Sequence, residues 1–286
     1  MSLDTIKRKI TSIKTTAKTT NAMKLVATAK LKRQRDHLAQ IKEYSADFYE
    51  VIGLLLSTVK DIGFLNVENA KDRTLYITIN STMGLAGSYN YNVNKVVKEI
   101  LTDNDITFTI GKKGNDFMRF EGRSNQVAKF FNLNDNDLNF DMTHAFAKEV
   151  LDLYLSGEVN RVVIVYTKFI NAITFEVETL QVLPFDTSTI EHMKSHLSVK
   201  NDIIIFHPNK EAIVRKILPN YISTILLGCL MNSKISENAS RRNAMDAATN
   251  NAKALAENYK LVYNTLRQGK ITSEITEIVG GSNDDD

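Results

Sequence analysis

The stretch TNAMKLVATAKLKRQR (residues 20–35) contains five lysines and arginines, no acidic residue and no aromatic residue, and its apolar residues recur at helical spacing. The surrounding charge is equally one-sided, because residues 5–35 hold ten Lys or Arg and no Asp or Glu, while the whole chain carries a net charge of only +3. Mixed charges four residues apart stabilise a solvated helix better than charges of one sign. The stretch therefore predicts a helix that pairs through its apolar stripe and presents its basic side to an acidic partner.

A ladder of apolar residues extends this helix in both directions. Residues 1–52 contain no Gly and no Pro, and twelve of sixteen positions at alternating three- and four-residue spacing are apolar. The sixteen positions are Leu3, Ile6, Ile10, Ile13, Ala17, Thr20, Lys24, Ala27, Leu31, Gln34, Leu38, Ile41, Ser45, Phe48, Ile52 and Leu55. This spacing is typical of a coiled coil, and at about 1.5 Å per residue it predicts a rod of roughly 80 Å. Three of the four polar exceptions lie between Thr20 and Gln34, where we expect something other than the chain's own core to face the helix.

A second ladder lies near the other end of the chain, where Gly is absent between Cys229 and Gln268. Its predicted members are Met245, Ala248, Ala252, Leu255, Tyr259, Val262 and Leu266, and after Gly269 the residues Ile271, Ile275 and Ile278 resume in a shifted phase. A long amphipathic helix is not stable with its apolar stripe in water. The two ladders therefore predict an antiparallel pair of helices.

Between the two ladders the pattern changes to strands alternating with helices. We expect strands at residues 74–79, 106–110, 161–169, 173–185 and 202–206, and helices from the glycine loop to about Leu101 and over residues 143–157. Such alternation predicts a largely parallel sheet, with one hairpin near Phe169 to Phe175.

The fold class predicted is α/β with a long antiparallel two-helix coiled coil, in which a small Rossmann-like α/β domain is inserted between the N- and C-terminal helices. The predicted boundaries are residues 1–60 for the first long helix, 70–207 for the α/β domain, 209–280 for the second long helix and 281–286 for an acidic tail.

The composition restricts the location of the protein. The single cysteine, Cys229, excludes an internal disulfide, and the charged residues Asp4, Lys7 and Arg8 occupy the place of an apolar signal segment. The longest apolar candidate, from Tyr221 to Met231, is much shorter than the roughly 18 residues of a membrane span. We expect an interior compartment, with any membrane contact made through partners.

No convincing catalytic centre is found in the sequence. The loop STMGLAGSYN (81–90) follows a strand and opens a helix, but Gly84 and Gly87 form only G-x-x-G and match neither nucleotide-binding fingerprint. We interpret the two glycines as positions of a tight turn. Cys229, in an apolar run, is interpreted as a small buried side chain rather than a nucleophile.

Three motifs, one near the start of the chain and two near its end, resemble the gamma subunit of the F-type ATP synthase. Residues 21–30, NAMKLVATAK, are similar to the family's T-K-A-M-x-M-V-A, and residues 240–252, SRRNAMDAATNNA, resemble its R-x-x-A-M-x-A-A-T-x-N-A. Residues 263–279, YNTLRQGKITSEITEIV, resemble Y-N-x-x-R-Q-x-x-I-T-x-E-x-x-E-I-V. The resemblance spans essentially the whole chain.

The first strand-to-helix turn departs from the family pattern S-D-[RK]-G-L-C-G. The chain has Ser81-Thr82-Met83-Gly84-Leu85-Ala86-Gly87 there, which keeps both glycines but lacks the Asp-basic pair and the Cys. We expect the turn to be kept and a polar contact of that pair to be absent. A paralogous rotary ATPase not used for ATP synthesis therefore stays open as an alternative.

The resemblance implies a non-catalytic central stalk that transmits torque between a membrane ring driven by ions and three catalytic sites. It implies three alpha and three beta subunits, an epsilon subunit and a ring of c subunits as partners, and no nucleic acid. It implies that this chain binds no cofactor and no metal, while ATP, ADP and Mg are held by alpha and beta. The expected location is the cytoplasmic side of the cell membrane, as a peripheral part of the complex.

The resemblance also implies where the rotor meets the stator. The residues carried over, or assigned by charge to the acidic loops of beta, are Met23, Lys24, Lys30, Lys32, Arg33, Arg35, Arg241, Arg267, Gln268 and Thr272. Among them Met23, Lys24 and Arg267 are expected to affect coupling, and Ile271, Ile275 and Ile278 to form an apolar bearing at the shaft tip.

Two other classes of protein stay open from the residues alone. A coiled-coil adaptor with an α/β head would explain the architecture and predicts self-association through the long helices. Nucleic-acid binding would explain the charge and predicts affinity that falls steeply with salt. Against it, the basic residues overlap the apolar seam, and the first aromatic residue is Tyr44.

Overall fold

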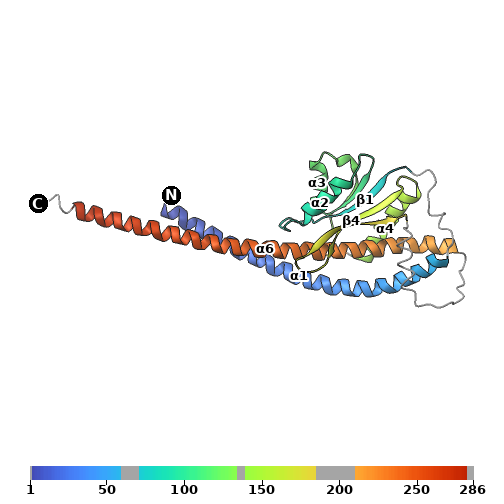
Figure 1. Cartoon of the computed structure of the whole chain (residues 1–286), viewed down its shortest axis with the longest axis horizontal. Coiled ribbons are helices and arrows are strands. Elements are labelled where there is room, and N and C mark those ends of the chain that lie inside the picture. Colours follow the sequence, from blue (N-terminus) through green and yellow to red (C-terminus); the bar gives the residue numbers. More distant parts are fainter. Residues whose placement is uncertain (1, 59–70, 134–138, 185–209, 282–286) are drawn as a thin grey trace. The chain divides into compact units, whose positions relative to one another are not determined.

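The computed structural model describes residues 2–58, 71–133, 139–184 and 210–281, and side chains are described for most of these residues. Two long helices occupy the two ends of the chain, α1 (Leu3–Thr58) and α6 (Lys210–Gly281) (Figure 1). The chain forms two compact units, one of residues 1–29 with 241–286 and one of residues 30–240. Both long helices contribute to both units.

The apolar ladder of α1 is confirmed wherever its side chains are described. From Leu3 to Leu38 every ladder position is buried or partly buried, and every position between them is exposed. Ile6 and Ala27 are almost completely buried, and even the polar exceptions Thr20, Lys24 and Gln34 lie on the covered side. The expectation that this stretch faces something other than the chain's own core is therefore wrong for the ladder positions themselves, because α6 covers them.

The ladder predicted for α6 is correct at four of its seven positions. Met245, Ala248, Ala252 and Tyr259 are buried or partly buried as expected, whereas Leu255, Val262 and Leu266 are exposed. The most deeply buried side chains between Met245 and Ala256 are Met245, Thr249, Ala252 and Ala256. Two adjacent stripes of α6 are apolar, and the one that contains Thr249, Ala252 and Ala256 faces α1. Gly269 does not interrupt the helix, since α6 continues to Gly281.

Antiparallel pairing of the long helices is confirmed in the unit of residues 1–29 and 241–286, and the two helices also touch in the unit of residues 30–240. In the unit of residues 1–29 and 241–286, Lys9 lies over the ring of Tyr259 and Lys24 pairs with Asp246. The residue numbers of α6 fall as those of α1 rise, so the two helices run in opposite directions. In the unit of residues 30–240, Asn238 Nδ2 donates a hydrogen bond to Gln34 Oε1 at 2.9 Å.

The inserted domain is built on a five-stranded sheet with the order β3-β2-β1-β4-β5. Its strands are β1 (Thr74–Ile79), β2 (Ile106–Ile110), β3 (Val127–Phe131), β4 (Arg161–Phe169) and β5 (Phe175–Leu183). The first four strands pair in parallel and β5 pairs antiparallel with β4, as the hairpin prediction required. The α/β fold class is therefore confirmed.

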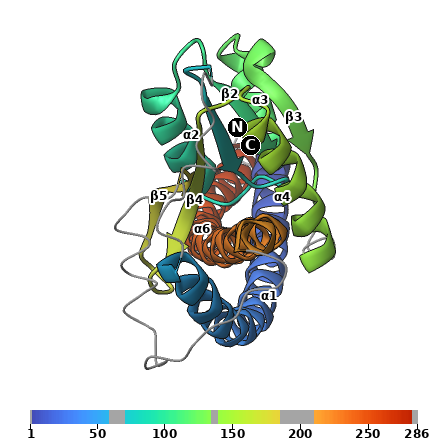
Figure 2. The same ribbon diagram turned by 90° about the vertical axis from the view of Figure 1, so that its right-hand side faces the viewer.

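Helices cover both faces of this sheet. On one face α4 (Phe140–Leu155) and α6 share a continuous apolar core with the strands, represented by Phe146, Ile164 and Leu226. On the other face α2 (Tyr89–Ile100) and α3 (Lys112–Phe120) bury a smaller cluster around Val93 and Met118. Figure 2 shows α2 and α4 on opposite sides of the sheet. The larger core thus binds the domain to α6.

Three short elements were not predicted from the sequence: α3, the 3-10 turn η2 (Ser124–Gln126) and β3. A glycine is required where α3 begins, because Gly111 has φ +91° and a Cβ there would lie 2.1 Å from the carbonyl oxygen of Asn80. The predicted strand 202–206 and the acidic tail 281–286 lie outside the residues described in full. Over the described residues, no helix combines the length and the apolar character needed to cross a membrane.

Candidate partner-binding surface

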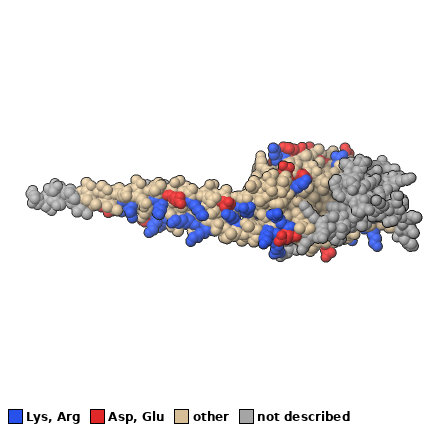
Figure 3. Space-filling model, turned by 60° about the horizontal axis from the view of Figure 1, so that its bottom comes forward, with Lys and Arg blue, Asp and Glu red and all other residues tan. Residues whose placement is uncertain are grey.

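Nine of the ten basic side chains between residues 5 and 35 are exposed. Their positions are Lys7, Arg8, Lys9, Lys14 and Lys18 in one unit and Lys30, Lys32, Arg33 and Arg35 in the other. On the face drawn in Figure 3, Lys and Arg side chains gather along the paired helices. Because the apolar ladder faces α6, the remaining sides of α1 carry this charge, as the sequence predicted. We refer to Lys30, Lys32, Arg33 and Arg35 as the basic cluster.

Met23 and Lys24 are neighbours with different surroundings. Met23 is 39% exposed and lies outside the covered ladder. Lys24 lies within the ladder, and its Nζ donates to Asp246 Oδ1 at 2.7 Å. The hydrogen bond and charge of Lys24 lower the pKa of the Asp246 carboxyl from its ordinary value. Lys24 therefore has a partner within its own chain.

The candidate residues of α6 differ in exposure. Arg241 is partly buried, whereas Arg267, Gln268 and Thr272 are exposed. Thr272 Oγ1 donates to the carbonyl oxygen of Gln268 at 3.0 Å, one helical turn away, so these two residues share a side of the helix. Ile271 and Ile275, expected at the shaft tip, are also exposed, and the side chain of Ile278 lies outside the described residues.

The β4–β5 hairpin adds a feature that the sequence analysis did not identify beside the basic cluster. The Arg35 guanidinium lies 5.8 Å from the ring centroid of Phe169, where the hairpin turn begins. Asn171 Oδ1 accepts hydrogen bonds from the backbone N–H groups of Ile173 and Thr174 at 2.9 and 2.8 Å, which fixes the turn. Ile173 at this turn is exposed.

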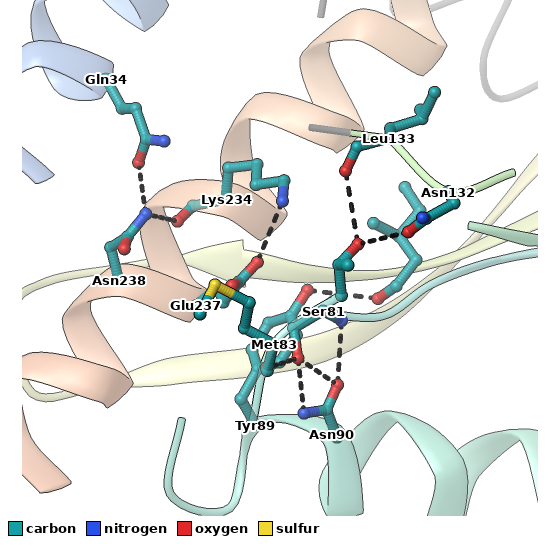
Figure 4. A network of polar contacts seen from close by, with 12 residues as sticks. Gln34, Ser81, Met83, Tyr89, Asn90, Asn132, Leu133, Lys234, Glu237 and Asn238 are labelled. Carbon is teal, nitrogen blue, oxygen red and sulfur yellow. Dashed lines mark hydrogen bonds and ion pairs between the residues drawn. The ribbon is translucent and has the colours of Figure 1, made fainter. Parts of the chain in front are cut away.

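The altered loop after β1 keeps a firm turn. Asn90 Oδ1 accepts from the backbone N–H of Ser81 at 2.9 Å, and Ser81 Oγ donates to the carbonyl oxygen of Met83 at 2.6 Å (Figure 4). Leu85 has φ +61° although it is not a glycine, and Gly87 has φ +56°. A left-handed leucine is uncommon and is held only where its surroundings determine it. The turn survives without the family's Asp-basic pair, as expected.

A row of serines attaches α6 to the domain, and the sequence analysis missed it. Ser233 Oγ accepts from the backbone N–H of Thr167 at 3.2 Å, and Ser236 Oγ donates to the carbonyl oxygen of Thr167 at 3.3 Å. Ser240 Oγ donates to the carbonyl oxygen of Ala86 at 2.6 Å. All three serines are buried, and their spacing of three and four residues on one side of a helix was the available signal. We call Ser233, Ser236 and Ser240 the serine row.

Other polar groups on the same part of α6 are also enclosed. Lys234 and Glu237, at 10% and 7% side-chain exposure, form an ion pair of 3.3 Å, which Figure 4 shows together with the Gln34–Asn238 contact.

Burial raises the pKa of the Cys229 thiol far above its ordinary range. This agrees with the interpretation of Cys229 as a buried small side chain, because only the thiolate is nucleophilic.

An α/β domain inserted between two long helices that pair antiparallel, with an exposed basic side, defines a coiled-coil shaft protein that presents its helices to partners. The family model described as "ATP synthase" matches residues 2–283. The chain is 69% identical over 286 residues to the ATP synthase gamma chain of Ureaplasma parvum, covering 99% of this chain and all of that one. It is 38% identical to the gamma chain of Mycoplasmoides gallisepticum over 98% of this chain and 99% of the relative. The chain therefore belongs to the ATP synthase gamma chain family.

Solved structures of the same architecture agree with the fold. A chain of the Euglena gracilis mitochondrial ATP synthase, in an assembly of OSCP, F1 and c-ring, matches with a TM-score of 0.68 and 19% identity over 98% of this chain and 93% of that chain. A central-stalk chain of the Tetrahymena thermophila mitochondrial enzyme matches with a TM-score of 0.62 and 24% identity, covering 80% of this chain and 98% of the other.

Proposed function

We propose that this chain is the non-catalytic central shaft of an ATP synthase that transmits torque between an ion-driven membrane ring and the catalytic sites of an alpha/beta head. The observation that carries the proposal is the full-length relationship, in which a gamma chain at 69% identity aligns with 99% of this chain. The match includes the inserted domain with its altered loop. The full-length match therefore favours an ordinary synthase over a paralogous rotary ATPase. Because the chain belongs to the gamma chain family, no observation favours the coiled-coil adaptor or the nucleic-acid-binding protein.

The fold has the parts that torque transmission requires. A single helix, α6, contributes to both units, and in the unit of residues 30–240 it is attached to the sheet by the serine row and by the larger apolar core. Force applied to the side chains of α6 can therefore reach the α/β domain through one continuous element. The proposed partners are three alpha and three beta subunits around the helices, with epsilon and the c-ring beside the domain.

The exposed basic side of α1 is proposed to face acidic loops of beta. Charge attraction between exposed groups is modest and adaptable, which suits a shaft that must present a different side to each catalytic subunit in turn. We assign the rotor–stator contacts to the basic cluster and to Arg241, Gln268 and Thr272, with Met23, Lys24 and Arg267 affecting coupling. ATP, ADP and Mg are proposed to bind to alpha and beta, and the complex to lie at the cytoplasmic side of the membrane.

The proposal is tested by purifying a tagged chain from its native cell, identifying the companions by mass spectrometry and assaying the eluate for ATPase activity. Alpha and beta subunits together with epsilon and c subunits are the expected result. Alpha and beta with unfamiliar companions would instead identify a rotary paralogue, and an eluate without ATPase activity would favour the adaptor.

Replacing Met23 by lysine is expected to weaken coupling while ATP hydrolysis continues. Met23 is exposed beside the covered ladder, so a cation there can form an additional contact with an acidic loop of beta. Hydrogen bonds to charged groups contribute about 1.5–3 kcal/mol, enough to hold one rotary position more firmly than the others. The measurement is ATP-driven proton pumping at matched ATPase rates, with Met23→Leu as the control. Pumping by the lysine variant equal to that of the leucine control would refute this role.

A further inference from the structure

Two polar contacts cross the helix pair about one turn apart in the unit of residues 1–29 and 241–286. Lys24 Nζ donates to Asp246 Oδ1 at 2.7 Å, and the hydroxyl oxygens of Thr20 and Thr249 also lie 2.7 Å apart. The Lys24 and Asp246 side chains are 32% and 45% exposed, whereas Thr249 is buried. Both contacts lie in the seam, in line with the apolar ladder of α1.

The threonine contact is fixed by a second bond on each side. Thr249 Oγ1 donates to the carbonyl oxygen of Met245 at 2.7 Å, and Thr20 Oγ1 lies 3.1 Å from the carbonyl oxygen of Thr16. Each hydroxyl has one proton, so when one threonine donates to its own helix the other can donate across the seam. The pair therefore links the helices whichever residue donates.

Apart from the buried Met245, the covered side chains around these contacts are small. Ala17 and Ala27 flank them on α1, and Ala252 and Ala256 follow on α6. Large interlocking side chains define the register of a coiled coil, because each one fits a single hole in the partner helix. Alanines present a nearly smooth surface and discriminate poorly between registers. In this segment the polar contacts are the groups that can distinguish one register from the next.

A slip of α6 by one heptad shows how strongly the two polar contacts discriminate between the native register and another one. Moving α6 by seven residues replaces Asp246 with Lys253 opposite Lys24, and Thr249 with Ala256 opposite Thr20. The ion pair becomes a repulsion between two lysines, and the hydroxyl contact is lost. The attraction in the native register and the repulsion in the slipped register both favour the native register.

We propose that Asp246 is a positioning residue that acts through Lys24: together with the Thr20–Thr249 contact, the Lys24–Asp246 pair fixes the register of α1 against α6. Thr20 lies opposite Thr249 and Lys9 beside Tyr259, so α6 runs past the start of α1 before it reaches Gln268 and Thr272. The register therefore decides how far these two residues stand beyond the end of α1, and so how the two helices present their contacts to the ring. Lys24 then affects coupling through Asp246 and not by touching the stator. This inference rests on the proposed function for its effect on coupling, but not for its effect on register.

The charges around Asp246 keep the pair intact at neutral pH. The Lys24 hydrogen bond is the main cause of its lowered pKa, and Arg242 and Lys253 on its own helix act in the same direction. A carboxyl whose pKa is lowered by folding stabilises the folded state above its ordinary pKa, and this contribution is lost as the pH falls through the lowered value. The pair is therefore present at neutral pH.

The test compares Lys24→Asp, Asp246→Lys and a charge-swapped variant that combines both changes with Lys253→Asp, in the complete reconstituted complex. The third change keeps like charges opposed in the slipped register, as in the wild type. Register is measured by cysteine cross-linking in a Cys229→Ala background, with Thr20→Cys/Thr249→Cys reporting the native register and Thr20→Cys/Ala256→Cys the slipped one. Each single variant is expected to raise the ratio of slipped to native cross-link by about tenfold, since a repulsion replaces an attraction. The swap should restore both the ratio and ATP-driven proton pumping. Lys18→Asp, a reversal at an exposed position of α1, serves as the charge control.

Two outcomes would overturn the inference. If the single variants keep the native cross-link, the pair does not define the register. If the swap recovers the native cross-link but pumps no better than Lys24→Asp, Lys24 contacts the stator directly. Failure of the proposed function is recognised separately, because the purified complex would then lack ATPase activity while the cross-link still reports the register.

Discussion

A shaft in which Lys30, Lys32, Arg33 and Arg35 are all replaced by glutamine is expected to assemble poorly with the catalytic ring and to deliver reduced torque. All four side chains are exposed on α1, and each can pair with an acidic group of beta. Exposed ion pairs contribute about 0.2–1 kcal/mol each, so the four together supply roughly 1–4 kcal/mol. Since 1.4 kcal/mol corresponds to a factor of ten, the yield of assembled head should fall by about tenfold or more at low salt.

Salt dependence separates this effect from a folding defect. At an ionic strength of 1 M the Debye length is about 3 Å, so the wild-type shaft should lose most of its advantage over the variant. The matched control replaces Lys95, Lys112, Lys148 and Arg161, four exposed residues of the α/β domain, with the same change in net charge. Assembly yield and torque are measured by gel filtration and single-molecule rotation. A quadruple variant that matches wild type at low salt would contradict the acidic-partner assignment.

Replacing the serine row by alanine is expected to disconnect the shaft helix from the domain. The triple variant leaves the backbone N–H and carbonyl of Thr167 and the carbonyl of Ala86 without their hydrogen bonds to α6. A buried polar group left without a partner costs about 1–3 kcal/mol, so the three changes remove a large part of the stability of a typical domain. We expect a clearly lowered melting temperature and, in the assembled complex, ATP hydrolysis that no longer drives full proton pumping.

A less disruptive variant keeps this prediction testable if the triple variant does not fold. Ser240→Ala removes only the 2.6 Å bond to Ala86 and should lower coupling to a smaller extent. Ser273→Ala, at an exposed position of the same helix, is the control and should leave both properties unchanged. Unaltered melting and pumping in the triple variant would show that the apolar core alone attaches α6.

The elements that the sequence predicted well share a simple pattern. Strands β1, β2 and β4 are short, strongly apolar runs bounded by polar turns, and the structure places them at the predicted residues. By contrast, β3 is an edge strand with mostly exposed side chains, and α3 has only nine residues, Gly114 and Asn115 among them. The mostly exposed β3 carries no alternating apolar signal, and the apolar residues of α3, Phe117, Met118 and Phe120, form too short a run to predict a helix.

The sequence predicted which residues of the candidate site are exposed and charged, but not which residues they contact. The basic stretch of α1 could be assigned to an exposed side because the ladder left no other place for it. The pairing of Lys24 with Asp246 and the attachment of Ser240 to Ala86 could not be predicted, since they join residues more than 150 positions apart. Only the folded chain brings such residues within hydrogen-bonding distance.

By itself the sequence determined that two long helices enclose an α/β domain and which stripe of α1 is covered, because that helix has a single apolar stripe. Only the tertiary structure decided the phase of α6, where Thr249 and Ala256 face α1 while Leu255 and Val262 remain exposed. The physical reason is that α6 carries two adjacent apolar stripes, and periodicity cannot say which of them a partner helix will cover. Small side chains allow the helix backbones to approach closely and let the Thr20–Thr249 and Lys24–Asp246 contacts form, and those contacts select the stripe.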